Sequence, residues 1–177
     1  MARIQPLNRN EATGSVASTL DSVKAKIGTV PNLFSTFANA PAALNGYLAF
    51  SDALTHGRLK PAQRESLALA IGQANSCQYC LSAHTLLGKG AGLSPDAIRN
   101  ARNGHSDDAL TNALVNLAVK IVQQRGVLSD DDLEQARQGG VDNGLIVEVI
   151  AHVALNTLTN YTNHIAATDI DFPVVQL

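Results

Sequence analysis

The sequence predicts a single all-α domain spanning residues 1–177, a helical bundle that assembles into oligomers. Apolar residues recur at helix spacing through several long segments, and proline, serine and glycine stand where such helices would begin and end. The β-branched residues are scattered among alanine and leucine instead of alternating with polar residues, so strands are not indicated. Only in the tail from Asp171 to Leu177 does the sequence pattern also fit a β-strand. A chain of 177 residues is long enough for one domain with its own core.

The first half of the chain shows three helix signals. Residues 41–56 begin with a proline in the first turn, carry apolar residues at helix spacing and end at Gly57. A second helix is predicted from Pro61 to about residue 75. A third begins at the cysteines and ends in the glycine-rich stretch 88–92, where repeated glycines allow a helix to stop.

Four more segments in the second half carry helix signals. Ser94, Pro95 and Asp96 supply an N-cap, a first-turn proline and a first-turn acid, and Ser129 with Asp132 resembles a capping box. Residues 106–125 and 143–159 are predicted as long, well-buried helices.

The two ends of the chain are candidate arms. An N-terminal arm of about residues 1–34 and a tail of about residues 165–177 carry apolar pieces outside the long helices, which pack either on another subunit or on the chain's own core. Aromatic residues make up only 4% of the chain, so each core residue buries little area, which favours subunit packing as additional burial.

The composition excludes several classes of protein. The net charge is −2, 16% of residues are charged and no basic run is present, which argues against nucleic-acid binding. The N-terminus shows no apolar stretch behind its basic residue, and no segment reaches the length of a membrane span. We therefore expect a cytoplasmic protein, where a cysteine pair more often cycles between dithiol and disulfide than acts as a permanent crosslink.

The chemistry is concentrated between residues 65 and 84. Cys77 and Cys80, the only two cysteines, form a C-x-x-C motif, and Asn75 or Ser76 is placed to N-cap the helix that carries them. The positive end of the helix dipole would favour the thiolate form of both sulfurs. The sequence therefore predicts redox-active cysteines.

A carboxylate and an imidazole accompany the two thiols. His84 falls on the same helix stripe as Cys77 and Cys80, at spacings of seven and four. Glu65 lies on the preceding helix, and a turn near residues 75 and 76 would make the two helices antiparallel and bring the carboxylate back toward His84. Glu65 and His84 are thus candidates for a proton relay to the sulfurs.

In this spacing of Glu65, Cys77, Cys80 and His84 the chain resembles the alkylhydroperoxidase D family of the carboxymuconolactone decarboxylase superfamily. The segments Val30–Phe34, Asn160–His164 and Asp171–Pro173 further resemble its peroxidase-related branch, so that the resemblance covers most of the chain.

The resemblance implies helical subunits in trimers or hexamers and a peroxidase in which Cys80 attacks an organic hydroperoxide or hydrogen peroxide. Cys77 would then form the disulfide, while Glu65 and His84 relay the proton. It also implies a dithiol reductant, such as a lipoylated protein, and neither a cofactor nor a metal.

Tyr79 departs from the family pattern, in which members with peroxidase activity often have a second histidine just before the later cysteine. A phenol is a poor base at neutral pH, so we expect a shorter or less efficient relay and weak activity.

Other readings of the motif remain open. The chain is alternatively a cofactor-free decarboxylase or lyase that transfers protons through His84 and Glu65, or a non-catalytic oligomeric redox sensor. The cysteines at redox spacing argue against lyase chemistry, which does not require them. A C-x-x-C with His84 also provides part of a zinc site, but structural zinc requires four ligands and no further cysteine is present.

A second polar group runs along the predicted helix 143–159. Glu148, His152, Asn156 and Asn160 lie on one face, where buried hydrogen bonds at a helix or subunit contact are favoured over a site. His164 follows and is free to point toward a neighbouring subunit. Glu148, Asn160 and Asn163 repeat the offsets of Glu65, Cys77 and Cys80, and an internal repeat would make residues 142–165 a helix pair.

Overall fold

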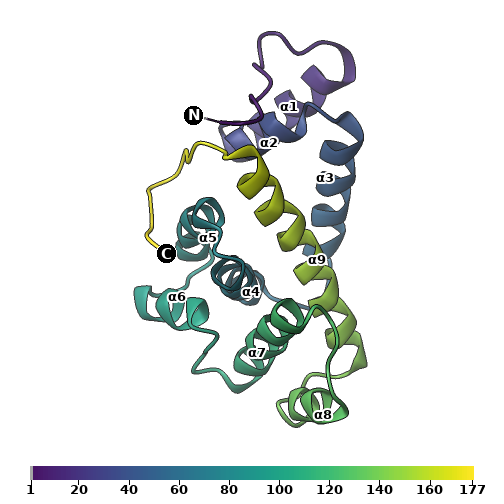
Figure 1. The fold of residues 1–177 in the computed structure, drawn as a ribbon, viewed down its shortest axis with the longest axis vertical. Helices are drawn as coiled ribbons and strands as arrows, with labels where there is room; N and C mark the ends of the chain where they lie inside the picture. Colours follow the sequence, from purple (N-terminus) through teal and green to yellow (C-terminus); the bar gives the residue numbers. More distant parts are fainter. Residues whose placement is uncertain (1) are drawn as a thin grey trace.

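The computed structural model describes residues 2–177, which form nine helices (Figure 1). They are α1 (Gly14–Ile27), α2 (Asn32–Phe37), α3 (Pro41–Thr55), α4 (Pro61–Ala74), α5 (Gln78–Gly90), α6 (Pro95–Arg102), α7 (Ala109–Gln124), α8 (Asp130–Gln138) and α9 (Asn143–Ala166). The predicted all-α fold is confirmed, and the tail 171–177, which the sequence left open to a strand, contains none.

Helix α4 lies at the centre of the fold, and α5, α6, α7 and α9 pack around it (Figure 1). Its residues 66–72 are all buried, because these neighbours cover every side of the helix. The main core is formed by α4, α7 and α9 together with Ala136 of α8. The helix that carries Glu65 is therefore among the most firmly held parts of the molecule.

Side-chain caps fix several helix starts. The hydroxyls of Ser94 and Ser129 accept backbone N–H bonds from Ala97 and Asp132, which confirms both predicted N-caps. Asp108 and Asp142 cap α7 and α9 in the same way.

Helix α9 is longer than predicted. It continues past residue 159 to Ala166 as one helix of 24 residues, so the helix pair expected from an internal repeat over 142–165 is wrong. Its last turns hold buried Thr159, Asn160 and Asn163, polar residues that resemble a helix end in sequence but find hydrogen-bond partners inside the fold.

The N-terminal region contains two helices that the sequence analysis did not identify. Leu20 of α1 and Leu33 and Phe37 of α2 are buried in one cluster with Cys77 and Cys80. Within one chain, this region therefore covers the cysteines.

The tail after α9 passes along α5 (Figure 1). The Val175 N–H donates to Ser82 Oγ at 3.1 Å, and Arg102 donates to the Gln176 carbonyl at 2.6 Å. These bonds explain why the tail is extended without a strand partner.

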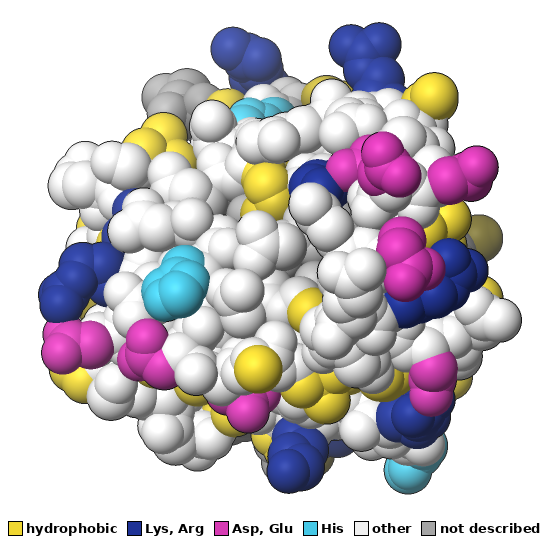
Figure 2. Space-filling view, turned by 90° about the horizontal axis from the view of Figure 1, so that it is seen from below, with side chains coloured by type: hydrophobic (Ala, Val, Ile, Leu, Met, Phe, Trp, Pro, Cys, Tyr) yellow, Lys and Arg dark blue, Asp and Glu magenta, His cyan; other side chains and the backbone are white. Residues whose placement is uncertain are grey.

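Acidic and basic side chains are interspersed on the face shown in Figure 2. Across residues 2–177 no single helix is both long and apolar enough to cross a membrane. Among the helices described, only α8 and α9 taken together reach the length and apolar composition of a membrane span, and the chain bends by 110° between these two helices.

Candidate active site

The turn between α4 and α5 presents the two cysteines. Ser76 has a left-handed backbone (φ 55°), and the Cys77 N–H donates to the Gly72 carbonyl at 2.8 Å. Cys77 itself is the N-cap of α5, and its sulfur accepts the Cys80 N–H at 3.3 Å. The expected cap by Asn75 or Ser76 is therefore wrong, because the left-handed turn shifts the helix start by one residue.

The two sulfurs form a disulfide. The Cα atoms of Cys77 and Cys80 lie 5.3 Å apart, within the usual range for a disulfide. Both residues are buried, with 2% and 3% of their surface exposed. The pair is thus oxidised and enclosed within the protein.

Glu65 and His84 form a second pair beside the cysteines. Antiparallel packing of α4 and α5 brings Glu65 Oε2 to 2.8 Å from His84 Nδ1. The two side chains are only 20% and 23% exposed. Because Nδ1 is occupied by Glu65, Nε2 is the ring nitrogen left to exchange a proton with a bound molecule.

Cys80 and His84 face the same cavity, which has a volume of about 120 Å³. Most of its lining is apolar or aromatic: Ile27, Pro31, Leu33, Phe34, Tyr47, Tyr79, Ala83, Leu87 and Phe172, together with Thr159 and Asn163. We call it the Cys80 cavity. Such a lining suits a small apolar molecule with one polar reactive group.

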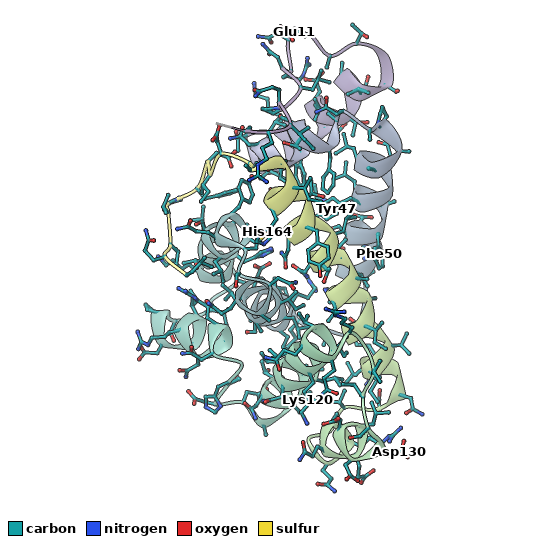
Figure 3. All side chains as sticks on the ribbon, in the orientation of Figure 1. Glu11, Tyr47, Phe50, Lys120, Asp130 and His164 are labelled. Atoms are coloured by element: carbon teal, nitrogen blue, oxygen red, sulfur yellow. A yellow bond between two sulfur atoms is a disulfide. The ribbon has the colours of Figure 1, made fainter. Side chains whose placement is uncertain are left out.

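A larger groove of about 780 Å³ between α1 and α3 meets the Cys80 cavity. Ile27, Phe34 and Tyr47 line both, and Tyr47 is labelled in Figure 3. The groove offers a route from solvent to Cys80.

Cys77 faces a different hollow, which we call the Cys77 groove, with a volume of about 300 Å³. Its lining includes Gln78, Thr168 and the exposed His164, which is labelled near the end of α9 in Figure 3. Tyr79 and Asn163 line both hollows and stand between them. The two sulfurs are thus approached from different sides.

Asn160 and Asn163 of α9 reach the site as well. Their side-chain amides donate to Cys80 Sγ at 3.0 and 3.4 Å. From the sequence, Asn160 is expected in a structural polar stripe, and the shared offsets of Asn160 and Asn163 suggest only a repeat; neither residue is predicted to contact Cys80. Their position beside the cysteine depends on how α9 packs against α5.

Tyr79 points its hydroxyl toward α2. That hydroxyl accepts the Leu33 N–H at 3.2 Å and is hydrogen-bonded to the Asp171 carboxylate. Burial and Asp171 raise the pKa of Tyr79 above its ordinary value of about 10, so the phenol stays protonated. Its hydroxyl binds structural partners instead of the Glu65–His84 pair.

The polar residues in the first half of α9 hold the fold. The Glu148 carboxylate accepts the N–H groups of Arg58 and Leu59, each at 3.0 Å, and so orders the entry to α4. His152 is 4% exposed, and burial lowers its pKa.

No cluster of three or more His, Cys, Asp or Glu side chains able to hold a metal occurs among residues 2–177.

The site defines a class: an all-helical protein with a buried cysteine pair beside a Glu–His pair. Residues 41–124, a little under half of the chain, match the carboxymuconolactone decarboxylase family. This segment carries Glu65, Cys77, Cys80 and His84, so the predicted resemblance to the carboxymuconolactone decarboxylase superfamily is confirmed over these residues. Among curated proteins, none matches the sequence.

Solved structures share the fold over nearly the whole chain. The alkylhydroperoxidase AhpD core protein of Ralstonia eutropha JMP134, an uncharacterized peroxidase-related protein, is 23% identical with a TM-score of 0.86, covering 96% of this chain and 92% of its own. A peroxidase-related protein of Silicibacter sp. TM1040 is 20% identical with a TM-score of 0.79, with coverages of 94% and 92%.

A third similar structure is the debrominase Bmp8 in complex with 2,3,4-tribromopyrrole. It is 15% identical with a TM-score of 0.80, covering 96% of this chain and 91% of its own. At these identities the likeness establishes the fold, which therefore accommodates more than one named activity.

Proposed function

We propose that the protein is a thiol-dependent hydroperoxide reductase that cycles Cys77 and Cys80 between dithiol and disulfide. The observation that supports this most strongly is that Cys80 and His84 face one apolar cavity while Glu65 holds His84 at 2.8 Å. A nucleophilic sulfur and a proton donor are thereby offered to the same bound molecule.

The reaction balances as follows. The Cys80 thiolate attacks the terminal oxygen of the hydroperoxide; an S–O bond forms, the O–O bond breaks, and the alcohol leaves with a proton relayed by His84 and Glu65. The Cys77 thiol then gives up its proton and attacks Cys80 Sγ; the disulfide bond forms, the S–O bond breaks, and hydroxide leaves with that proton as water. A dithiol reductant restores both thiols through two exchange steps and is itself oxidised to a disulfide.

The cavity favours organic hydroperoxides over hydrogen peroxide, because its apolar walls and the adjoining α1–α3 groove suit a hydrocarbon group. A lipoylated protein is one dithiol of the required chemistry. The cytoplasmic location remains an expectation from the cysteine chemistry.

We also propose that the protein is a homo-oligomer. Large apolar side chains of α9 are exposed along its length: Val147, Ile150, Leu158, Tyr161 and Ile165, at 43–66%. An apolar stripe of this kind supports burial against another copy.

A second candidate is reductive dehalogenation of a small aromatic ring. The rings of Phe34, Tyr47, Tyr79 and Phe172 around the cavity favour an aromatic ligand. The electron balance is the same: the dithiol supplies two electrons, a carbon–halogen bond becomes a carbon–hydrogen bond, and halide leaves.

The test is anaerobic treatment of the reduced protein with one equivalent of cumene hydroperoxide, followed by intact mass and free-thiol count. The wild type should lose two thiols and two mass units rapidly. Cys80→Ser should not react, and Cys77→Ser should leave a sulfenic acid on Cys80 that dimedone labels. Dimedone labelling of Cys77 in Cys80→Ser would reverse the assigned roles.

The proton relay is tested by Glu65→Gln and His84→Gln, which should slow the peroxide step about 10²-fold or more, with the exposed His105→Gln as the matched control. No thiol loss with peroxide would reject the peroxidase. Thiol loss with a brominated pyrrole instead would then favour dehalogenation, and turnover of a lactone by a Cys77→Ser protein would favour the lyase.

A further inference from the structure

Two carboxamide groups converge on one sulfur of the disulfide. Asn160 Nδ2 lies 3.0 Å and Asn163 Nδ2 3.4 Å from Cys80 Sγ. Asn160 is 0% exposed and Asn163 5%, so water does not compete strongly for these donors. Among the bonds found for residues 2–177, Cys77 Sγ accepts one hydrogen bond, from the Cys80 backbone N–H at 3.3 Å. The two sulfurs are thus unequally provided with donors.

The orientation of Asn160 is fixed by the turn that carries the cysteines. Asn75 Nδ2 donates to Asn160 Oδ1 at 2.8 Å, so the Asn160 N–H groups point toward Cys80. Asn75 is the C-cap of α4 and stands two residues before Cys77. The segment that positions the disulfide therefore also positions the amide.

Asn163 shows that stability alone does not explain this arrangement. Its Oδ1 atom is buried without a hydrogen-bond partner, a situation that costs about 1–3 kcal/mol. A residue retained only to hold α9 in place would be expected to satisfy both ends of its amide. Its N–H is used on sulfur while its carbonyl is left unpaired.

Amide donors distinguish between the charge states of Cys80. A disulfide sulfur is a weak acceptor, whereas a thiolate accepts charge-assisted hydrogen bonds of about twice the strength of neutral ones. Hydrogen bonds to the charged form of a group favour that form. The two amides therefore stabilise reduced, ionised Cys80 more than the disulfide seen here.

We propose that Asn160 and Asn163 form a thiolate-stabilising pair that makes Cys80 both the leaving group when the disulfide is reduced and the nucleophile afterwards. A reductant thiolate attacks Cys77 Sγ, a new S–S bond forms to the reductant, and the Cys77–Cys80 bond breaks with its electron pair on Cys80. The amide pair thus assigns a role to each of the two sulfurs. Only the oxidising step, in which Cys80 attacks a peroxide, rests on the proposed function.

The test measures the pH dependence of Cys80 alkylation by iodoacetamide in a Cys77→Ser background, where Cys80 is the single thiol. Asn160→Leu and Asn163→Leu should each raise the midpoint by about one pH unit, which slows alkylation about tenfold at pH values well below the midpoint. Asn160→Asp should shift it further, because a carboxylate repels the thiolate. The matched control is Asn156→Leu, a buried amide of α9 that donates to the His152 carbonyl and not to sulfur.

Asn75→Ala removes only the anchor of Asn160 and gives a milder variant should the leucine variants unfold. It should shift the midpoint in the same direction by a smaller amount. Midpoints that stay unchanged in the folded variants, or an equal shift in Asn156→Leu, would overturn the proposal. Because alkylation needs no peroxide, a shifted midpoint in a protein without peroxidase activity would refute the proposed function and leave the amide pair standing.

Discussion

Tyr79, which stands between the two cysteines, is predicted to stabilise the fold by capping a helix from a distance. Helix α2 begins after Pro31, which supplies no side-chain cap. Instead, Asp171 Oδ2 accepts the Asn32 N–H at 2.8 Å and the Tyr79 hydroxyl accepts the Leu33 N–H at 3.2 Å. The phenol and the tail together satisfy the first donors of α2.

Replacing Tyr79 by Phe removes the hydroxyl and keeps the ring, whose centroid lies 5.6 Å from that of Phe172 in an edge-to-face contact. The buried Leu33 N–H then loses its acceptor, and the hydrogen bond to Asp171 is lost as well. Together these should cost about 2–3 kcal/mol. For a chain of this size the Tm should fall by roughly 4–12 °C.

Thermal unfolding of the oxidised protein, followed by far-UV circular dichroism, measures the change. Ser15→Ala, which removes the hydroxyl of an exposed residue in α1, is the control and should shift the Tm by about 1–2 °C at most. A Tyr79→Phe shift no larger than that of the control would refute the capping role. A double-mutant cycle with Asp171→Ala should show coupling between the two caps.

Three further predictions concern pH and backbone packing. Burial lowers the pKa of His152 and so favours its neutral form. The stability that this gives above the unfolded pKa of about 6.5 should be lost as the pH falls. In urea titrations at several pH values, His152→Leu should therefore lose less stability below about pH 6.5 than the wild type. Burial raises the pKa of Tyr47 to about 12, so the folded state should lose stability as pH rises above 10, and Tyr47→Phe should lose less over that interval. Gly57→Ala should lower the free energy of unfolding by about 1–3 kcal/mol, because the added methyl group meets the Glu148 carboxylate. Gly46→Ala should raise it by about 0.5–1 kcal/mol, because the new methyl group enters open space beside α3. Equal effects of the two variants in denaturant titrations would contradict this prediction.

Much of the fold could be predicted because its signals are local. The starts of α6 and α8 follow from Ser94 and Ser129, whose caps involve residues three positions away. The pairing of Glu65 with His84 follows from one turn between adjacent helices, across only 19 positions. Such features depend on short segments whose conformation the sequence largely specifies.

The features that sequence reasoning missed depend on distant contacts. Helices α1 and α2 lack side-chain caps of their own, and α2 relies on Tyr79 and Asp171, 46 and 139 positions away. The amides of Asn160 and Asn163 meet Cys80 across 80 and 83 positions. The left-handed conformation of Ser76 carries no residue signal, since glycine is the usual occupant of such a position.

The separation of the Cys80 cavity from the Cys77 groove by Tyr79 and Asn163 has a kinetic meaning. In an enzyme where oxidant and reductant alternate at one sulfur, an excess of either blocks the other and produces competitive substrate inhibition. In the proposed cycle the peroxide reacts at Cys80 and the reductant attacks Cys77, so each substrate has its own sulfur and its own approach. Reciprocal plots of rate against peroxide concentration should therefore remain parallel as the reductant is raised to saturation, without the upward curvature that a shared entrance would produce.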